Sequence, residues 1–178
     1  MKKIVQKEDK VLRQKTKEIS VNTIKTPKIQ KILKEMSGAL KSQSDGVAIA
    51  APQIGYPLSL FVVSGKIFHK DFVRGEKEFE KIPEKEILKD LVFINPKILK
   101  LSREKEWLSE GCLSARWLYG KTYRSKKATI TAYDGNGKKF QRGASGLLAQ
   151  IFQHETDHLK GMLFIDHAKE IKEELPAK

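Results

Sequence analysis

His154 and His158 are spaced so that both can bind one metal ion. They belong to the motif HETDH at residues 154–158, inside the largely apolar run of residues 146–159. On an α-helix, side chains four residues apart point the same way, so the two imidazoles can bind one divalent cation. Glu155, next to the first histidine, can then reach a water on that ion. This is the HExxH arrangement of metal-dependent hydrolases.

A bare HExxH match has a simpler alternative, a helix that merely exposes two histidines and an acid. Here apolar residues recur at helical spacing, which predicts an amphipathic helix packed at least partly on a core. These apolar positions are Leu147, Leu148, Ile151, Phe152 and Leu159.

Cys112 is the candidate for a third ligand, because a tetrahedral catalytic site needs three protein ligands and one open position. It is the one cysteine of the chain and lies in the segment EGCLS, residues 110–114. The commonest alternative is a buried, inert thiol. The polar neighbours Glu110 and Ser114 disfavour that alternative, and Gly111 allows the backbone to approach a ligand closely.

Residues 46–55, with the sequence GVAIAAPQIG, form a third segment of interest. Its small residues let the backbone approach another group, and the Gln53 amide can donate a hydrogen bond to a developing oxyanion. Taken alone, the segment favours the alternative, a plain turn between a helix and a strand.

Together, and in this order, the three segments resemble the peptide deformylases. That family carries GxGxAAxQ, EGCLS and QHExDHLxG, which correspond here to residues 46–53, 110–114 and 153–161. The second and third match fully, whereas Ala48 replaces the second glycine of the first. The resemblance extends to about residue 167. The stretch between the first two segments is longer than in typical members, and Ala115-Arg116-Trp117 stands where the family usually has a small hydrophobic residue and proline.

The resemblance implies a metal-dependent hydrolase that removes the formyl group from the N-terminal formyl-methionine of newly made polypeptides. Cys112, His154 and His158 would hold one divalent metal ion, Fe²⁺ in cells, with Zn²⁺, Ni²⁺ or Co²⁺ also accepted. Glu155 would take a proton from the attacking water and deliver it to the leaving amine. The Gln53 amide and the Leu113 backbone N–H would stabilise the oxyanion.

Five further positions match family positions that contact the substrate. Leu147 and Ile151 match residues of the methionine pocket, and Val47, Ala48 and Gly111 match residues along the substrate backbone. At Ala48 the extra methyl group either presses on the bound peptide or packs harmlessly in an adapted local fold.

Two other functions remain open at this point. The first is an HExxH metalloendopeptidase that cuts internal peptide bonds, which the EGCLS segment disfavours. The second is an inactive, ribosome-associated homologue, which Glu155 and the complete ligand set disfavour.

The length predicts one domain, residues 1–178, which the resemblance implies is catalytic and which ends in a charged tail over residues 166–178. The chain has 35 basic and 22 acidic residues, a net charge of +13. This charge serves either solubility or contact with a polyanion such as ribosomal RNA. The sequence has no basic motif interleaved with aromatic residues, and we expect no specific DNA binding. The lone cysteine and the lack of a signal-like or membrane-length apolar run predict a cytoplasmic location without membrane contact.

The pattern of elements predicts an α+β fold, with short antiparallel sheets packed around a central helix carrying HExxH and an additional N-terminal helix. Thr26 and Pro27 begin that first helix, and Gly161 ends the HExxH helix. We expect residues 65–90 to form a solvated loop, the alternative being a flap over the site. The expected strands are residues 58–63, 91–94 (stopped by Asn95-Pro96), 128–133, 138–141 and 162–165, and the tail is expected to form a weak helical turn.

Overall fold

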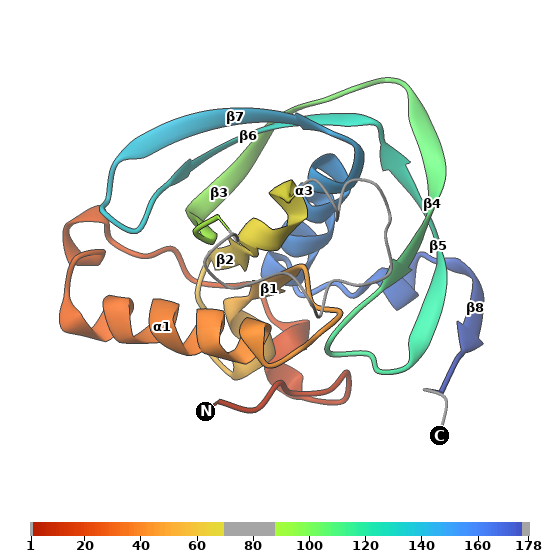
Figure 1. Cartoon of the computed structure of the whole chain (residues 1–178), viewed down its shortest axis with the longest axis horizontal. Coiled ribbons are helices and arrows are strands. Elements are labelled where there is room, and N and C mark those ends of the chain that lie inside the picture. Colours follow the sequence, from red (N-terminus) through yellow and green to blue (C-terminus); the bar gives the residue numbers. More distant parts are fainter. Residues whose placement is uncertain (1, 70–87, 176–178) are drawn as a thin grey trace.

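The computed structural model describes residues 2–69 and 88–175 of the chain (Figure 1). The α-helices in these residues are α1 (Pro27–Lys41) and α3 (Gly146–Leu159), neither of which is long and apolar enough to cross a membrane. The strands are β1 (Ala48–Ala50), β2 (Leu60–Val63), β3 (Leu91–Leu101), β4 (Lys105–Gly111), β5 (Leu118–Ser125), β6 (Lys127–Tyr133), β7 (Lys139–Ser145) and β8 (Lys169–Glu173). Short 3₁₀ helices are η1 (Lys10–Arg13), η2 (Val21–Thr23), η3 (Ala51–Ile54), η4 (Gly65–Phe68) and η7 (Phe164–Asp166).

The strands form a five-stranded sheet in the order β1-β2-β3-β6-β7 and a three-stranded sheet in the order β4-β5-β8. Neighbouring strands in both sheets pair antiparallel. The predicted α+β class with antiparallel sheets is therefore confirmed.

Helix α3 packs against strands of both sheets, namely β6, β1, β7 and β3 of the larger sheet and β5 of the smaller one. Figure 1 shows α3 enclosed between β6 and β7 above, β1 below and β5 to the right. Aromatic packing holds it on the larger sheet. Phe93 stacks on Phe61 with ring centroids 4.6 Å apart, and Phe152 of α3 meets Phe93 at 5.2 Å. Because these rings are fully buried, they fix the rotation of α3 and hence the direction of its histidines.

Helix α1 begins at Pro27 as predicted, although the Thr26 side chain does not cap it. The Thr26 hydroxyl instead donates to the Thr23 carbonyl at 2.7 Å. The buried face of α1 covers β1, β2 and η3; its residues are Ile29, Ile32, Leu33, Met36, Ala39 and Leu40.

The prediction that Asn95-Pro96 stops the second strand is wrong. β3 continues to Leu101, with a bulge between Ile94 and Lys97 where Asn95 adopts a φ of 50°. The Asn95 side chain accepts from the Ile19 N–H at 2.8 Å and donates to the Ile19 carbonyl at 2.7 Å. Proline is tolerated because a bulge interrupts the ladder at that point.

Two predictions near the C-terminus are also wrong. Residues 162–165 are not a strand, because the turn of η7 occupies their second half, and the Leu163 N–H bonds to the Asp166 carboxylate at 2.8 Å. The charged tail contains no helical turn among its described residues. Its residues Lys169–Glu173 form β8, an exposed edge strand on β5, where the hydrogen bonds come from the ladder rather than from an apolar face.

Residues 70–87 lie outside the described residues, so a loop or flap there stays a prediction. At the start of the expected solvated loop the prediction is wrong, because residues 65–68 form η4, in which Gly65 and Ile67 are buried. The predicted strands at residues 128–133 and 138–141 correspond to β6 and β7, which pair as a hairpin. In the turn between them the Asp134 carboxylate accepts from the N–H groups of Asn136 and Lys138 at 2.8 and 2.9 Å. Gly161, with a φ of 79°, follows the end of α3 as expected.

Candidate metal centre

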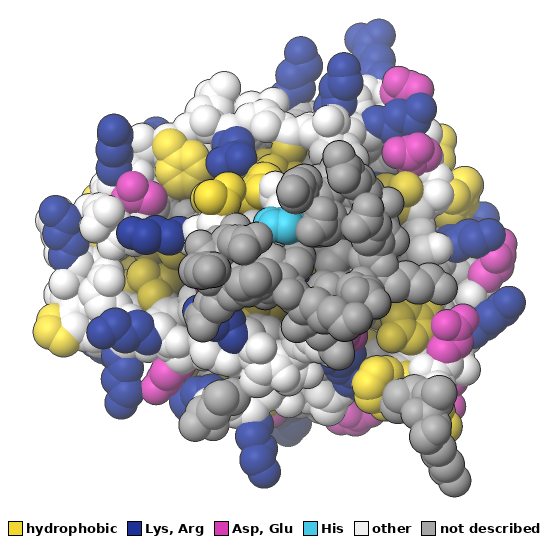
Figure 2. All heavy atoms as spheres, in the orientation of Figure 1, with side chains coloured by type: hydrophobic (Ala, Val, Ile, Leu, Met, Phe, Trp, Pro, Cys, Tyr) yellow, Lys and Arg dark blue, Asp and Glu magenta, His cyan; other side chains and the backbone are white. Residues whose placement is uncertain are grey.

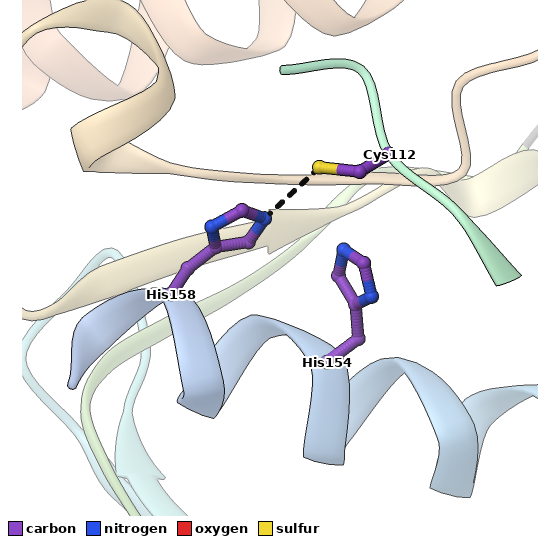
Figure 3. A group of neighbouring side chains, drawn as sticks. All are labelled: Cys112, His154 and His158. Carbon is purple, nitrogen blue, oxygen red and sulfur yellow. Dashed lines mark hydrogen bonds between the residues drawn. The ribbon is translucent and has the colours of Figure 1, made fainter. Parts of the chain in front are cut away.

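Cys112 meets His154 and His158 at the point where the end of β4 passes over helix α3 (Figure 3). One candidate ligand atom from each residue lies within 4.8 Å of the other two. The Cys112 Sγ is 3.2 Å from Nε2 of His158, and the two imidazole centroids are 5.0 Å apart. One helical turn and one strand end therefore place a sulfur and two nitrogens around a common point.

This donor set fits a four-coordinate metal. A thiolate with two imidazoles suits zinc or iron far better than magnesium or calcium, which prefer oxygen. Three protein ligands also leave one position for a water or a substrate atom. Cys112 and His154 line the pocket described below, which lets the fourth position face that space.

Glu110 orients the first histidine. Its Oε2 lies 3.1 Å from Nδ1 of His154, which leaves Nε2 of that imidazole for the metal. A carboxylate behind a metal-bound histidine fixes the ring and raises its basicity. The sequence singled out the EGCLS segment without assigning this role to Glu110.

Arg124, on β5, was missed by the sequence analysis. Its guanidinium donates to both carboxylate oxygens of Glu110 at 2.8 and 3.0 Å, and to Asp157 of α3 at 2.7 Å. These three residues, the floor network, are almost completely buried. A lone arginine in a strand of alternating polarity does not stand out as a functional residue. The available clue was that Glu110 and Asp157 both lie in fully matched motifs, where buried acids need a cationic partner.

The electrostatics of the floor network favour ionised Glu110. Burial would raise the pKa of its carboxyl, but hydrogen bonds from His154 and Arg124 outweigh burial and hold it far below the usual range. Burial likewise opposes a charge on His154, yet Cys112 and Glu110 raise the pKa of this imidazole. Since a metal binds the neutral imidazole, a metal at this site would compete with a proton for His154.

Glu155 is 3% exposed, and its Oε2 has no hydrogen-bond partner among the described residues. Burial raises the pKa of this carboxyl to about 7. An unpaired buried carboxylate oxygen is costly, so it indicates a group kept for a ligand or a reaction. Glu155 also lines the pocket beside His154.

Gln53 approaches the candidate metal ligands from η3. Its Oε1 accepts from the Ala50 N–H at 2.8 Å, which directs Nε2 toward Cys112 Sγ at 3.5 Å and Ser114 Oγ at 3.2 Å. Leu113 follows Cys112 and lines the same pocket. The structure therefore brings both expected oxyanion donors next to the thiol.

The pocket above the three ligands has a volume of about 300 Å³. One wall is residues 45–48, the opposite wall is residues 109–119, and α3 forms the floor. All five residues expected to contact the substrate line it: Val47, Ala48, Gly111, Leu147 and Ile151.

Gly111 has a structural role in addition to the expected close approach to a ligand. A Cβ atom at this position would lie 2.8 Å from the ring of Tyr119 on the paired strand. The remaining motif residue, Gln153, ties α3 to β5. Its amide accepts from the Ser125 N–H at 3.0 Å and donates to the Ser125 carbonyl at 2.9 Å.

A family model described as "Polypeptide deformylase" matches residues 1–174 of this chain. A peptide deformylase from Borreliella burgdorferi is 40% identical over 160 residues, covering 90% of this chain and 83% of the relative. Peptide deformylase 2 from Clostridium acetobutylicum is 39% identical over 159 residues, covering 89% of each. The crystal structure of a peptide deformylase from Legionella pneumophila aligns with a TM-score of 0.77 at 31% identity, covering 96% of this chain and 87% of that one.

Proposed function

This chain belongs to the peptide deformylase family, and we propose that Cys112, His154 and His158 are its metal ligands and Glu155 its catalytic base. The protein is a metal-dependent hydrolase that removes the formyl group from the N-terminal formyl-methionine of new polypeptides. The observation that carries the assignment of residues is the meeting of one thiol and two histidines beside the unpaired Glu155 carboxylate.

The metal we assign is ferrous iron, with zinc, nickel and cobalt as alternatives that the same donors accept. When bound, the ion supplies a Lewis acid and a water of lowered pKa. Glu110 supports this assignment, because its hydrogen bond to His154 Nδ1 presents Nε2 of that ring to the ion.

Glu155 moves the proton. Its Oε2 takes a proton from the water that attacks the formyl carbon, and then gives it to the methionine nitrogen as the C–N bond breaks. A carboxyl whose pKa is raised by burial to about 7 suits both directions of transfer. A bound dication would favour the ionised form before attack.

The Gln53 amide and the Leu113 backbone N–H stabilise the oxyanion of the attacked formyl group. The Ala50 N–H supports this role. It binds the Gln53 side-chain oxygen, so that the side-chain nitrogen of Gln53 faces Cys112. A donor fixed in advance needs no reorganisation during the reaction.

The substrate methionine enters between the two walls of the pocket. Ile151, which is 4% exposed, and the more exposed Leu147 provide apolar surface from α3 for its side chain. The backbone of the substrate runs beside Val47, Ala48 and Gly111. In this arrangement the formyl group would lie over the three proposed ligands.

We further propose that residues 1–178 act as one catalytic domain in the cytoplasm and do not need a membrane. A contact with the ribosome would use the basic surface. The net charge of +13 supports attraction to RNA. Figure 2 shows lysine and arginine side chains spread around one face rather than gathered in one patch, which fits a diffuse contact.

Neither rival function is favoured by the family membership. Formate release from a formyl-Met peptide, measured anaerobically with added ferrous iron, tests the proposal. We expect stoichiometric formate and a new free amino terminus, and both should disappear after the metal is removed with a chelator. Cleavage of internal peptide bonds without formate would indicate the endopeptidase instead.

A further inference from the structure

The mouth of the pocket carries an ion pair that the reaction itself does not use. Arg116 belongs to the wall of residues 109–119, and Asp45 belongs to the opposite wall. Their side chains are 19% and 51% exposed, whereas Glu110 and His154 below them are 4% and 12% exposed. This gradient of exposure places the pair at the solvent side of the pocket.

The guanidinium of Arg116 bridges the two walls with two hydrogen bonds and makes a third to Gln43, just before the wall of residues 45–48. It donates to the two carboxylate oxygens of Asp45 at 2.5 and 3.0 Å, and to Gln43 Oε1 at 2.7 Å. It also lies 4.8 Å from the centre of the Trp117 ring. A bidentate, stacked guanidinium has one defined geometry, which a flexible lysine would not reproduce.

Other hydrogen bonds also hold the wall of residues 109–119, among them one from Gln150 of α3 to the Ser109 carbonyl at 2.9 Å. Gln6 donates to the Leu113 carbonyl at 3.1 Å, and Gln53 donates to Ser114 at 3.2 Å. Neither reaches the wall of residues 45–48. The Arg116–Asp45 pair is therefore a direct polar link between the two walls at the mouth.

We propose that the Arg116–Asp45 pair is a clamp that sets the spacing of the pocket mouth and thereby determines affinity for the peptide beyond the formyl-methionine. The inference rests on the proposed function. It concerns positions where this chain departs from the family pattern, since Arg116 stands where a proline is usual. The hydrogen bond from Arg116 also lowers the pKa of Asp45, which keeps the pair ionised at neutral pH.

The test compares two substrates on the iron-loaded full chain: formyl-methionine amide, which ends inside the pocket, and the longer formyl-Met-Ala-Ser. Arg116→Met and Asp45→Asn should each raise KM for the longer peptide about three- to fivefold, the scale of a partly exposed ion pair. The value of kcat should stay within about twofold, and KM for the short amide should change little.

The double variant Arg116→Asp with Asp45→Arg should restore most of the lost affinity, because the pair is re-formed in the reverse sense. Lys97→Met is the matched control. It breaks the exposed Lys97–Glu18 pair, 3.0 Å long and outside this pocket, and should change neither KM. Unchanged KM for both substrates, or a parallel loss of kcat and melting temperature without rescue, would overturn the clamp.

A binding measurement separates this inference from the proposed function. Calorimetry of formyl-Met-Ala-Ser on Glu155→Gln protein, with and without Arg116→Met, reports the clamp without turnover. We expect the Kd of the protein carrying both Glu155→Gln and Arg116→Met to be three- to fivefold larger than that of Glu155→Gln alone, about the effect of an exposed ion pair. An equal Kd contradicts the clamp even if formate release succeeds. Absent formate release with a changed Kd contradicts only the catalytic proposal.

Discussion

Two arginine–carboxylate groups flank the same pocket, and they differ chiefly in burial. At the floor, Arg124 pairs with Glu110 and Asp157, and its side chain is 7% exposed. At the mouth, Arg116 pairs with Asp45, whose side chain is 51% exposed. We propose that the same chemistry has two uses: the floor network holds His154, a proposed metal ligand, in one orientation, and the mouth clamp sets affinity for the peptide.

Solvent explains the difference. Each charge at the floor depends on its protein partners, because little water can replace them, and loss of one partner leaves another charge buried. At the mouth, water and salt screen the pair, so its loss should lower the free energy of unfolding only slightly. Stability should therefore depend strongly on the floor and weakly on the mouth.

The largest effect is expected for Arg124→Met. It leaves the buried Glu110 carboxylate without its two arginine hydrogen bonds, which should lower the free energy of unfolding by about 3–5 kcal/mol. Arg116→Met, the matched change at the mouth, should lower it by less than about 1 kcal/mol. Urea unfolding of both variants measures the contrast, and equal losses would contradict the division between floor and mouth.

Glu155→Gln changes a side chain of α3 in the pocket and leaves all three residues of the floor network in place. The amide keeps the shape but cannot accept a proton, so turnover should fall about 100-fold or more, the scale of a general base. Metal content and melting temperature should stay near the wild-type values. If formate release survived nearly intact, the proton would have to move through another group.

Cys112→Ser tests the ligand set directly. Replacing a soft thiolate by a hydroxyl should weaken metal retention at least about tenfold or shift the preference away from iron and zinc. Metal analysis after gel filtration should give about one equivalent per wild-type chain and clearly less in the variant. Equal metal content and equal activity would remove Cys112 from the site.

The part of the site that lies on α3 could be predicted from the sequence, because a helix places residues four apart on one side whatever surrounds it. His154 and His158 follow from that period, and Glu155 follows from its place beside His154 in the HExxH motif. Cys112 was a candidate ligand because it is the one cysteine of the chain and has polar neighbours. The family resemblance strengthened that choice, since nothing local shows that the end of β4 crosses α3. Arg124 was missed because its partners, Glu110 and Asp157, lie 14 and 33 positions away in the chain.

The strands show the same limit. The apolar residues of β2 and β6 identified these strands, whereas β4 and β8 are rich in charge and are stabilised by pairing with β5 rather than by an apolar pattern. The bulge at Asn95 was hidden for a related reason. Its stability comes from hydrogen bonds to Ile19, a residue 76 positions away.

The smallest effect is expected for Ala48→Gly, on the wall between the mouth and the floor. Ala48 is 6% exposed and packs in the core cluster that includes Phe61 and Phe152, although it also lines the pocket. Its methyl group is thus largely used in packing. Glycine at this position loses that packing and gains backbone freedom in the unfolded chain.

We therefore expect Ala48→Gly to destabilise the protein by about 1 kcal/mol, a fall of about 2–4 °C in melting temperature, with kcat/KM unchanged. The competing idea is that the methyl group presses on the bound peptide, in which case kcat/KM for formyl-Met peptides should rise instead. Kinetics and thermal melting on the same preparation decide between them. A gain in kcat/KM without a lower melting temperature would show that this wall acts on the substrate, as the mouth clamp does. A lower melting temperature alone would show that Ala48 contributes to stability, as the buried floor network does.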